Sequence, residues 1–392
     1  MLGFLLARAG IDVVVLEKHG DFLRDFRGDT IHPSTLELMH ELGLYDEFLR
    51  LPHAKASLLR ARLGDRMVTM ADFRRLPTRA KFVAFLPQWD FLDFLAARAR
   101  ALPAFELRLA TEATELLRDG ERIAGVVARD ADGAIAIHAD LTIACDGRSS
   151  RLRDLAGMTV QRLGAPMDVL WFRLAKPASD HGETMGTFDR GQILIQIDRG
   201  THWQCASVIA KGGAAALQAQ GIESFRAGIA ALAPALADRV HELTDWTMVK
   251  LLSVAVDRVS VWHRDGFLCL GDAAHAMSPI GGVGVNLAIQ DAVAAANLLH
   301  EPLRRGRVPV AELARVQARR LWPTRVTQRL QLFVQDRVIA RVLAGAAVRP
   351  PFVVKLLQWL PFLQRLPARL IGLGLRPEHI RSPECGASTD SR

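Results

Sequence analysis

The pattern richest in chemistry runs from Phe267 to Ala292, FLCLGDAAHAMSPIGGVGVNLAIQDA. An apolar run predicts a buried strand that ends at Gly271-Asp272, and the turn 281–284 (GGVG) precedes a long helix. Glycines let main-chain N–H groups approach a ligand, and a helix N-terminus presents the positive end of its dipole to an anion. An Asp directly after a strand can accept a hydrogen bond from a sugar or polyol hydroxyl. The segment therefore predicts a site for an anionic ligand that carries hydroxyl groups.

Two further segments place a polar residue at the end of a predicted strand. In LTIACDGRSSRLRDL (141–155) a strand ends at Cys145, Asp146-Gly147 follow, and a helix is expected to start at Ser149 or Ser150. The run 11–16 (IDVVVL) is β-branched throughout, which predicts a strand of a parallel sheet buried on both faces. Glu17 stands at its carboxyl end, where dinucleotide-binding folds carry the acidic residue that binds the adenosine ribose.

The complete pattern GDAAHxxxPxGGxGxNxAIQDA resembles the second FAD motif of the p-hydroxybenzoate hydroxylase family, the flavin-dependent aromatic hydroxylases. Asp146-Gly147 resembles the family's DG motif, which lies near the pyrophosphate and is linked to FAD and reduced-nicotinamide binding, with Arg151 at the motif's basic position. The resemblance implies that Asp272 holds the flavin ribityl chain. It also implies that the segment beside the flavin ring comprises Pro279, Gly281, Gly282, Gly284, Val285 and Asn286.

The same resemblance assigns two positions nearer the N-terminus. Arg27, in RGDTI, matches the family's loop whose arginine contacts the cofactor. Gln88, at the start of a helix predicted over Trp89–Leu102, matches a position that contacts the FAD phosphate or ribityl region. Outside the family each residue has an ordinary alternative: Arg27 a surface charge, Gln88 a helix cap, and Glu17 a solvated strand end.

One departure from the family concerns the N-terminus. Family members open with a strand and GxGxxG, placed before the helix that Met1–Ala9 would complete and Gly10 would close. These residues do not occur here. We expect the first Met to be internal to a longer reading frame, because the downstream motifs are intact, with a true truncation as the alternative. We also expect the 392-residue form to bind FAD weakly and an upstream-extended form to bind it tightly.

The order of elements predicts an α/β fold: a Rossmann-like FAD-binding domain, without its first strand and GxGxxG, interrupted by an antiparallel sheet-rich substrate domain and followed by a helical C-terminal region. Ser34–Glu37 is expected to be a capping box, 58–73 a hairpin, and Asp119-Gly120 and Asp132-Gly133 hairpin turns. The predicted division is 1–56 FAD-binding, 57–87 substrate-side, 88–165 FAD-binding with the DG motif, 166–258 substrate domain, 259–300 FAD-binding with the second motif, and 301–392 helical.

Composition narrows the class of protein. With 50% apolar and 23% charged residues the chain can bury a large core, which argues against general disorder. Four widely spaced cysteines predict a reduced, cytoplasmic setting without structural zinc. The net charge of +8 is concentrated after residue 300, where 17 Lys/Arg face 6 Asp/Glu at helical spacing. A solvated helix face is expected there, and no nucleic-acid-binding signature is present.

The resemblance also implies the reaction. NADH or NADPH reduces FAD, the reduced flavin takes up O2 as a hydroperoxide, and one oxygen atom passes to an electron-rich, usually aromatic, small molecule. No catalytic residue or metal is assigned. The chain has a single tyrosine, Tyr45, so a Tyr–Tyr relay that deprotonates a phenol is excluded. His275 is expected to be structural rather than a base. The substrate pocket is expected in Met167–Val208 and Thr247–Val256, with candidates Trp171, Trp203 and Phe188.

Alternative functions remain open. The run Phe352–Leu375 alternates leucines with Arg365 and Arg369, as an interfacial helix of a membrane-surface, quinone-pathway hydroxylase could. Pro361 and Pro367 interrupt this run, so packing on the FAD domain is favoured. A flavin-dependent halogenase is disfavoured, because its WxWxIP motif is absent. A truncated, flavin-free fragment without activity is the non-enzyme alternative.

Overall fold

Parallel strands carry the motifs in the computed structural model, which describes residues 1–23, 30–180, 182–189, 191–346 and 352–385. β1 (Val13–Leu16) pairs with β7 (Phe105–Arg108), and β11 (Thr142–Ala144) pairs with β20 (Phe267–Cys269). β19 (His263–Arg264) extends the second pair in antiparallel fashion. Among the described residues the two pairs belong to separate sheets.

The two pairs differ in burial, and this corrects one sequence expectation. β20 is buried along its whole length, whereas every residue of β1 is at least partly accessible and Val14 is 40% exposed. The expectation that the first strand is buried on both faces is therefore wrong. The physical reason is that β1 has a strand partner on one side only among the described residues, so its β-branched side chains lack neighbours along the other edge.

Three helices pack together beside these strands. They are α1 (Leu2–Arg8), α4 (Gln88–Arg100) and α8 (Gly284–Arg304), and they share one apolar core. Gly10, with φ of 77°, follows α1 as expected. The segment Ile280–Arg304 is long and apolar enough to cross a membrane, but 61% of its most apolar stretch is buried within the protein. Core helices of globular proteins satisfy the same length and composition criteria, so this is weak evidence for a span.

A mixed seven-stranded sheet forms the other half of the molecule, in the order β17-β13-β16-β15-β14-β4-β5. Its strands are β4 (Leu58–Leu63), β5 (Arg66–Asp72), β13 (Met167–Ala175), β14 (Met185–Asp189), β15 (Gln192–Asp198), β16 (His202–Ala210) and β17 (Lys250–Leu252). The predicted hairpin over 58–73 is thus confirmed, and its strand β4 pairs in parallel with β14.

The two faces of this sheet have different neighbours. Leu170, Phe172 and Trp203 pack against α7 (Ile222–Leu232), and α6 (Ala214–Ala219) precedes that helix. On the opposite face Val169, Val208 and Ile193 pack with α10 (Ala340–Leu343) and with Ile280 of the glycine turn. We call this second face the inner face, because it is the one that meets the turn.

Three smaller sheets complete the described part of the fold. β8 (Glu112–Asp119), β9 (Arg122–Asp130) and β10 (Gly133–His138) form an antiparallel sheet whose two turns lie where the Asp-Gly pairs predict them. β2 (Thr30–Ile31), β6 (Val83–Phe85) and β3 (Ala54–Ala56) form another. β12 (Val160–Arg162) pairs with β18 (Asp257–Val259).

The predicted capping box at 34–37 is wrong, although the helix itself is confirmed. α2 (Pro33–Glu41) starts two residues earlier than a box with Ser34 as N-cap requires, with His32 as its N-cap and Pro33 in the first turn. Proline fits this position because the N–H it lacks would have no helical partner. Glu37 instead accepts a hydrogen bond from the N–H of Arg79 at 2.6 Å. The short helix α3 (Tyr45–Phe48) follows.

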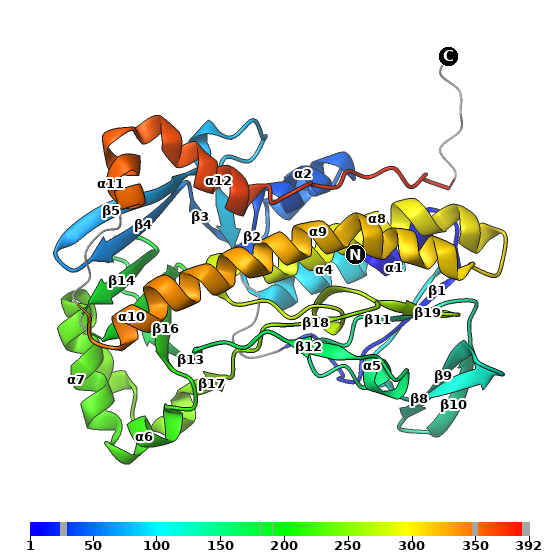
Figure 1. The fold of residues 1–392 in the computed structure, drawn as a ribbon, viewed down its shortest axis with the longest axis horizontal. Coiled ribbons are helices and arrows are strands. Elements are labelled where there is room, and N and C mark those ends of the chain that lie inside the picture. Colours follow the sequence, from blue (N-terminus) through cyan, green and yellow to red (C-terminus); the bar gives the residue numbers. More distant parts are fainter. Residues whose placement is uncertain (24–29, 181, 190, 347–351, 386–392) are drawn as a thin grey trace.

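The last quarter is helical as predicted. α9 (Val310–Val334) runs the length of the molecule beside α8 and continues through a π-helical turn over Gln335–Ile339 into α10 (Figure 1). α11 (Phe352–Trp359) and α12 (Arg365–Gly372) then pack beside β5 at one end of the molecule (Figure 1). Residues 376–385 return along α8 to α1, where the N–H of Cys385 donates to the carbonyl of Arg8 at 2.7 Å.

Candidate cofactor-binding site

The two strand-end motifs lie side by side. Because β11 and β20 are parallel and in register, Asp146-Gly147 and Gly271-Asp272 leave the sheet at the same edge. The N–H of Leu270 donates to the carbonyl of Ala144 at 3.0 Å. Arg148 then reaches across, with its Nη2 3.7 Å from Oδ2 of Asp272. Arg148 is not among the residues predicted from the sequence, where its only signal is its place directly after the DG pair.

The glycine turn is packed tightly against β2. Gly281 and Gly282 have φ of 78° and 61°, a region that favours glycine. The Oγ1 of Thr30 donates to the carbonyl of Gly282 at 3.3 Å, and a Cβ on Gly282 would lie only 2.2 Å from that Oγ1. A side chain at residue 282 is thus opposed by both conformation and space.

Asn286 connects the turn to the start of α2. Its Oδ1 accepts hydrogen bonds from the N–H of His32 (2.9 Å) and the Oγ1 of Thr35 (2.8 Å). Its Nδ2 donates to the carbonyls of Thr30 (2.9 Å) and Gly282 (3.3 Å). An Asn side chain has two acceptor sites and two donor hydrogens, and all four are used within the protein. Its side chain therefore fixes the geometry of the turn, which leaves its main-chain N–H for a ligand.

The N-terminus of α8 offers main-chain donors. The first helical hydrogen bond joins the N–H of Leu287 to the carbonyl of Val283 at 2.9 Å. The N–H groups of Gly284, Val285 and Asn286 precede it and point out of the helix end. Together with the positive end of the helix dipole they suit the phosphate or ring oxygens of a flavin nucleotide. Pro279 begins the turn and accepts at its carbonyl from the N–H of Gly282 (3.0 Å).

His32 lies behind this turn and is buried. Its Nδ1 is 2.7 Å from the carbonyl oxygen of Ile371 at the C-terminal part of α12, and its ring also faces the main chain of Gly281. Burial lowers the pKa of His32 to about 4, although both main-chain contacts act in the opposite direction. The imidazole is therefore neutral near pH 7, and it donates from Nδ1 to Ile371.

The DG turn is held from behind. The Ser150 side chain caps α5 (Arg151–Leu155) by accepting from the N–H of Arg153 at 3.1 Å, which confirms the predicted helix start, and Asp146 accepts from the N–H of Leu152 at 3.3 Å. Gly147 has φ of 87° and open space where a Cβ would stand. That free space at a main-chain turn is what a closely approaching pyrophosphate requires.

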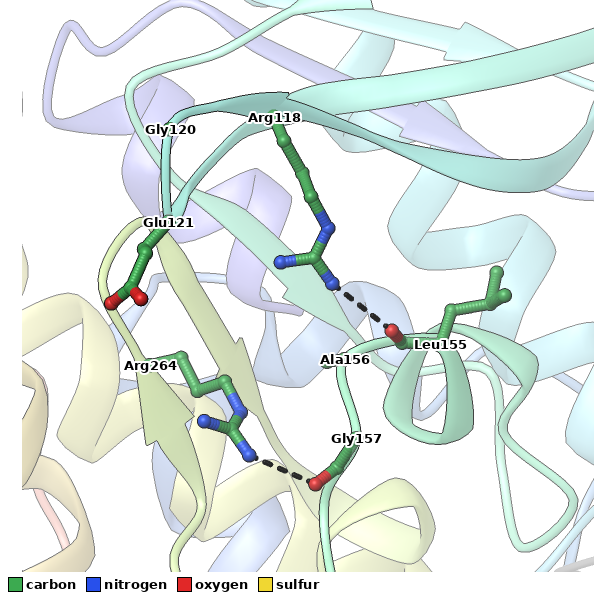
Figure 2. Close-up of a pocket in the computed structure, with 7 residues that line it drawn as sticks. All are labelled: Arg118, Gly120, Glu121, Leu155, Ala156, Gly157 and Arg264. Carbon is green, nitrogen blue, oxygen red and sulfur yellow. Dashed lines mark hydrogen bonds between the residues drawn. The ribbon is translucent and has the colours of Figure 1, made fainter.

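An open hollow of about 400 Å³ lies at the far end of α5 and is not part of this arrangement. Figure 2 shows the guanidinium groups of Arg118 and Arg264 pointing at the main-chain carbonyls of Leu155 and Gly157, with hydrogen bonds of 3.2 and 2.9 Å. Both arginines therefore secure the C-terminal end of α5.

The remaining predicted cofactor residues are placed by their strands. Glu17 directly follows β1, and its carboxylate accepts from the N–H of His19 at 2.9 Å. Gln88 is the first residue of α4 and lies three residues after Phe85, which pairs with Thr30 of β2. Arg27 lies outside the described residues.

A buried charge network supports the second motif. His275 bonds to Asp291 of α8 (Nε2 to Oδ2, 2.6 Å), and Arg320 of α9 donates to the other oxygen of Asp291 at 2.9 Å. Arg320 also contacts Glu378 at 3.2 Å, and all four side chains are buried. Burial raises the pKa of a carboxyl, but the charges and hydrogen bonds of His275 and Arg320 outweigh it and lower the pKa of Asp291. These contacts agree with the structural role expected for His275, which stays a prediction.

The aromatic pocket candidates fall on different faces of the large sheet. Trp203 packs on the α7 side and donates from Nε1 to Asp180 at 2.9 Å, so its expected place in the pocket is wrong. Trp171 and Phe188 are half-buried on the inner face, where Ile280 also packs. Tyr45 is partly buried and packs against the core that α1, α2 and α4 share. Among the described residues no group of three His, Cys, Asp or Glu side chains could hold a metal ion.

Comparison with known proteins gives a consistent result. Residues 1–329 match the model of the FAD binding domain family. The chain is 33% identical over 353 residues to 6-methylpretetramide 4-monooxygenase of Streptomyces rimosus, covering 89% of this chain and 84% of that protein. It is 28% identical to rifampicin monooxygenase of Streptomyces venezuelae, over 74% of this chain and 60% of that protein.

Solved structures show the same fold. PqsL of Pseudomonas aeruginosa in complex with 2-aminobenzoylacetate superposes with a TM-score of 0.76 at 22% identity, covering 88% of this chain and 95% of that one. The family model and the 33% identical relative together establish the family. The cofactor is accordingly FAD, with reduced nicotinamide as the family's usual co-substrate. The chain belongs to the FAD-dependent aromatic hydroxylases (monooxygenases).

Proposed function

We propose that the chain adds one oxygen atom to an aromatic molecule chemically related to 6-methylpretetramide. The name of the 33% identical relative supports this substrate class, and that relative is matched over 84% of its length. The observation that carries the proposal is the convergence of the DG pair, Asp272 and the glycine turn at one sheet edge, with the inner face of the large sheet packed against Ile280.

The residues present suit FAD. The N–H groups at the start of α8 and the open space at Gly147 would hold the phosphates, with Asp146 supporting the DG turn. The carboxylate of Asp272 would accept hydrogen bonds from the ribityl hydroxyls, with Arg148 fixing its position. Glu17 would bind the adenosine ribose, and Gln88 and Arg27 would complete the site. Bound FAD would supply the redox and oxygen-transfer chemistry.

The proposal assigns cofactor binding to 1–56, 88–165 and 259–300, and the substrate to 57–87 and 166–258. In support, β4 and β5 are part of the same sheet as β13–β16. The inner face offers Trp171 and Ile195 to a flat apolar ring system. Tyr45 is the single tyrosine and packs against the core shared by α1, α4 and α8. Any proton leaving the substrate is therefore proposed to pass to another kind of side chain or to water.

The proposed setting is the cytoplasm. All four cysteines are free, which suits a reducing compartment that also supplies NADH and NADPH. Among them Cys205 and Cys269 are buried in apolar surroundings, where burial raises the thiol pKa well above its ordinary value and suppresses reactivity.

The test begins with FAD binding, measured by fluorescence titration. Asp272→Asn should weaken binding relative to the parent chain by about 1–3 kcal/mol, the cost of a lost charge-assisted hydrogen bond. Asp119→Asn, in an exposed hairpin turn, is the matched control and should leave affinity unchanged. Equal affinity of parent and Asp272→Asn in folded protein would remove Asp272 from the site.

The reaction is then tested with FAD-loaded protein. Without substrate, the oxidation of NADH or NADPH should be slow. Addition of 6-methylpretetramide should accelerate it and cause consumption of O2, while a product with one additional oxygen atom accumulates. Acceleration by simple phenols or hydroxybenzoates in place of 6-methylpretetramide would overturn the substrate class while leaving the reaction class intact. Reduction of the flavin only by a separate reductase would overturn the single-protein hydroxylase.

A further inference from the structure

The helices α11 and α12 near the C-terminus leave an unusual apolar surface exposed. Six large side chains of α11, α12 and the 3-10 turn between them (Pro361–Gln364) are exposed: Phe352 (69%), Val353 (64%), Trp359 (71%), Leu360 (40%), Phe362 (47%) and Leu366 (56%). We call these six residues the apolar patch. Single exposed apolar residues are ordinary, but six within fifteen positions mark an interaction surface.

The patch belongs to a firmly held element. Val354 packs with Ala61, Leu63 and Val68 of the β4–β5 hairpin. The Gln358 side chain pairs with the main chain of Thr69 on the edge strand β5, accepting from its N–H (3.3 Å) and donating to its carbonyl (2.9 Å). Covering the edge strand in this way fixes which face of α11 points outward. The apolar outer face is therefore a property of the fold.

Sequence expectation had favoured packing of this run on the FAD domain because of its prolines. In the structure Pro361 begins the 3-10 turn between α11 and α12, whereas Pro367 lies within α12. Both helices pack beside β5, and α12 also contacts His32, in the part predicted to bind FAD, through the carbonyl of Ile371. Val354 and Ala368 are buried by this packing, and the apolar patch stays exposed. The two helices lie at one end of the molecule (Figure 1).

The charge around the patch identifies what it contacts. From residue 337 to 377 the chain contains seven Lys/Arg and no Asp or Glu. Lys355 lies three residues after Phe352 and four before Trp359, on the same helix face. Lys355, Arg365 and Arg369 are exposed and have no ion-pair partner among the described residues.

We propose that the apolar patch and its basic rim bind the surface of an anionic membrane. Trp and Phe side chains insert at the boundary between headgroups and acyl chains, and nearby Lys and Arg attract anionic headgroups. A second copy of this chain is disfavoured as occupant, because a two-fold contact would bring Lys355, Arg365 and Arg369 of both copies together. The inference goes beyond the proposed function and needs neither FAD nor substrate.

The test is flotation of the full chain with vesicles. Vesicles of equal phosphatidylglycerol and phosphatidylcholine should bind the protein, pure phosphatidylcholine should bind it far less, and high salt should release it. The triple variant Lys355→Gln/Arg365→Gln/Arg369→Gln should bind roughly 100-fold more weakly, from about fivefold per charge. The control Arg50→Gln/Arg100→Gln/Arg129→Gln removes three exposed charges elsewhere and should bind like the parent.

The apolar contribution is tested separately. Trp359→Ser/Phe362→Ser should weaken binding at least tenfold, whereas Trp322→Ser, at a tryptophan that is 54% exposed on α9, should not. Thermal melting checks that each variant is folded. The proposal would be overturned if the parent failed to bind anionic vesicles. It would equally be overturned if the triple charge variant and the Trp359→Ser/Phe362→Ser variant both bound as tightly as the parent. The proposal would also be overturned if the parent sedimented as a dimer, the patch variants sedimented as monomers, and vesicle binding stayed the same.

Discussion

The two parallel strand pairs started from similar sequence patterns and ended in different surroundings. β20 is fully buried, and the turn and helix after it are joined to β2, α2, α9 and residue 378 by side-chain hydrogen bonds. β1 has the more strongly β-branched sequence, yet Val14 is 40% exposed. The comparison teaches that an apolar run reports the capacity of a strand to be buried, whereas the partners on both sides decide whether it is.

The largest expected effect comes from the charge network behind β20. Asp291→Asn leaves Arg320 buried with one carboxylate fewer, so the free energy of unfolding should fall by about 3–5 kcal/mol. Chemical denaturation measures it. Asp154→Asn, which removes a 66% exposed carboxylate from an arginine, is the control and should change stability little. A small loss for Asp291→Asn would mean that the network does not anchor this region.

Next comes the glycine turn. Gly282→Ala forces a positive φ on alanine and drives its Cβ into the Thr30 side chain, so stability should fall by about 2–4 kcal/mol and FAD affinity with it. Gly281→Ala also has a positive φ, but its nearest neighbour would be 3.5 Å away, so it should cost only about 1 kcal/mol. Thr30→Ala should recover part of the Gly282→Ala loss. Equal effects of the two glycine variants would refute the steric argument.

His32 gives a pH-dependent test of the same region. Its lowered folded pKa means that the unfolded chain binds the proton more tightly, so the stabilisation is complete above the ordinary histidine pKa near 6.5 and is lost as pH falls toward about 4. Between pH 7 and 5 this one group should remove about 2 kcal/mol of stability.

Melting curves of the parent and His32→Gln at both pH values measure the difference. The variant should lose less stability on acidification than the parent, whatever its stability at pH 7. His40→Gln changes an exposed histidine and is the control, so the pH dependence of its stability should match that of the parent. An identical pH dependence of parent and His32→Gln would show that His32 is not held neutral.

The smallest expected effect concerns β1, the more exposed of the two strands compared above. Val14→Thr, on the exposed β1, should change stability by less than about 0.5 kcal/mol. The same substitution at Val259, which is fully buried beside β20, should cost about 1–3 kcal/mol because it buries a hydroxyl. A costly Val14→Thr would mean that β1 is more enclosed in solution than in the structure.

Local patterns predicted most of what local chemistry decides. The strands before Asp146 and Asp272, the hairpin turns at the Asp-Gly pairs and the long helix after Gly284 follow from apolar runs and turn residues. Each of these features depends on residues within a few positions of one another.

What could not be predicted depends on distant partners. Asn286 was predicted to belong to the segment beside the flavin ring, which stays a prediction. The four hydrogen bonds of its side chain, three to residues about 250 positions away and one to its own turn, had no signal in the sequence. Arg320 is one of seventeen basic residues at helical spacing that were expected to form a solvated face, and it is instead fully buried. No local signal distinguishes it from its neighbours, because only Asp291 and Glu378 make its burial favourable.

The pairing of Arg320 with Glu378 also constrains when the protein can complete its folding during synthesis. The two residues are 58 positions apart, with α10, α11 and α12 between them. At about 5–20 residues per second, the ribosome adds Glu378 about 3–12 s after Arg320. During that interval α9 can lie along α8, but the guanidinium of Arg320 lacks Glu378, one of its two carboxylate partners. Closure of the region that holds the glycine turn is thus a late event in synthesis, and nascent chains paused before residue 378 should be more readily cleaved by protease there than released ones.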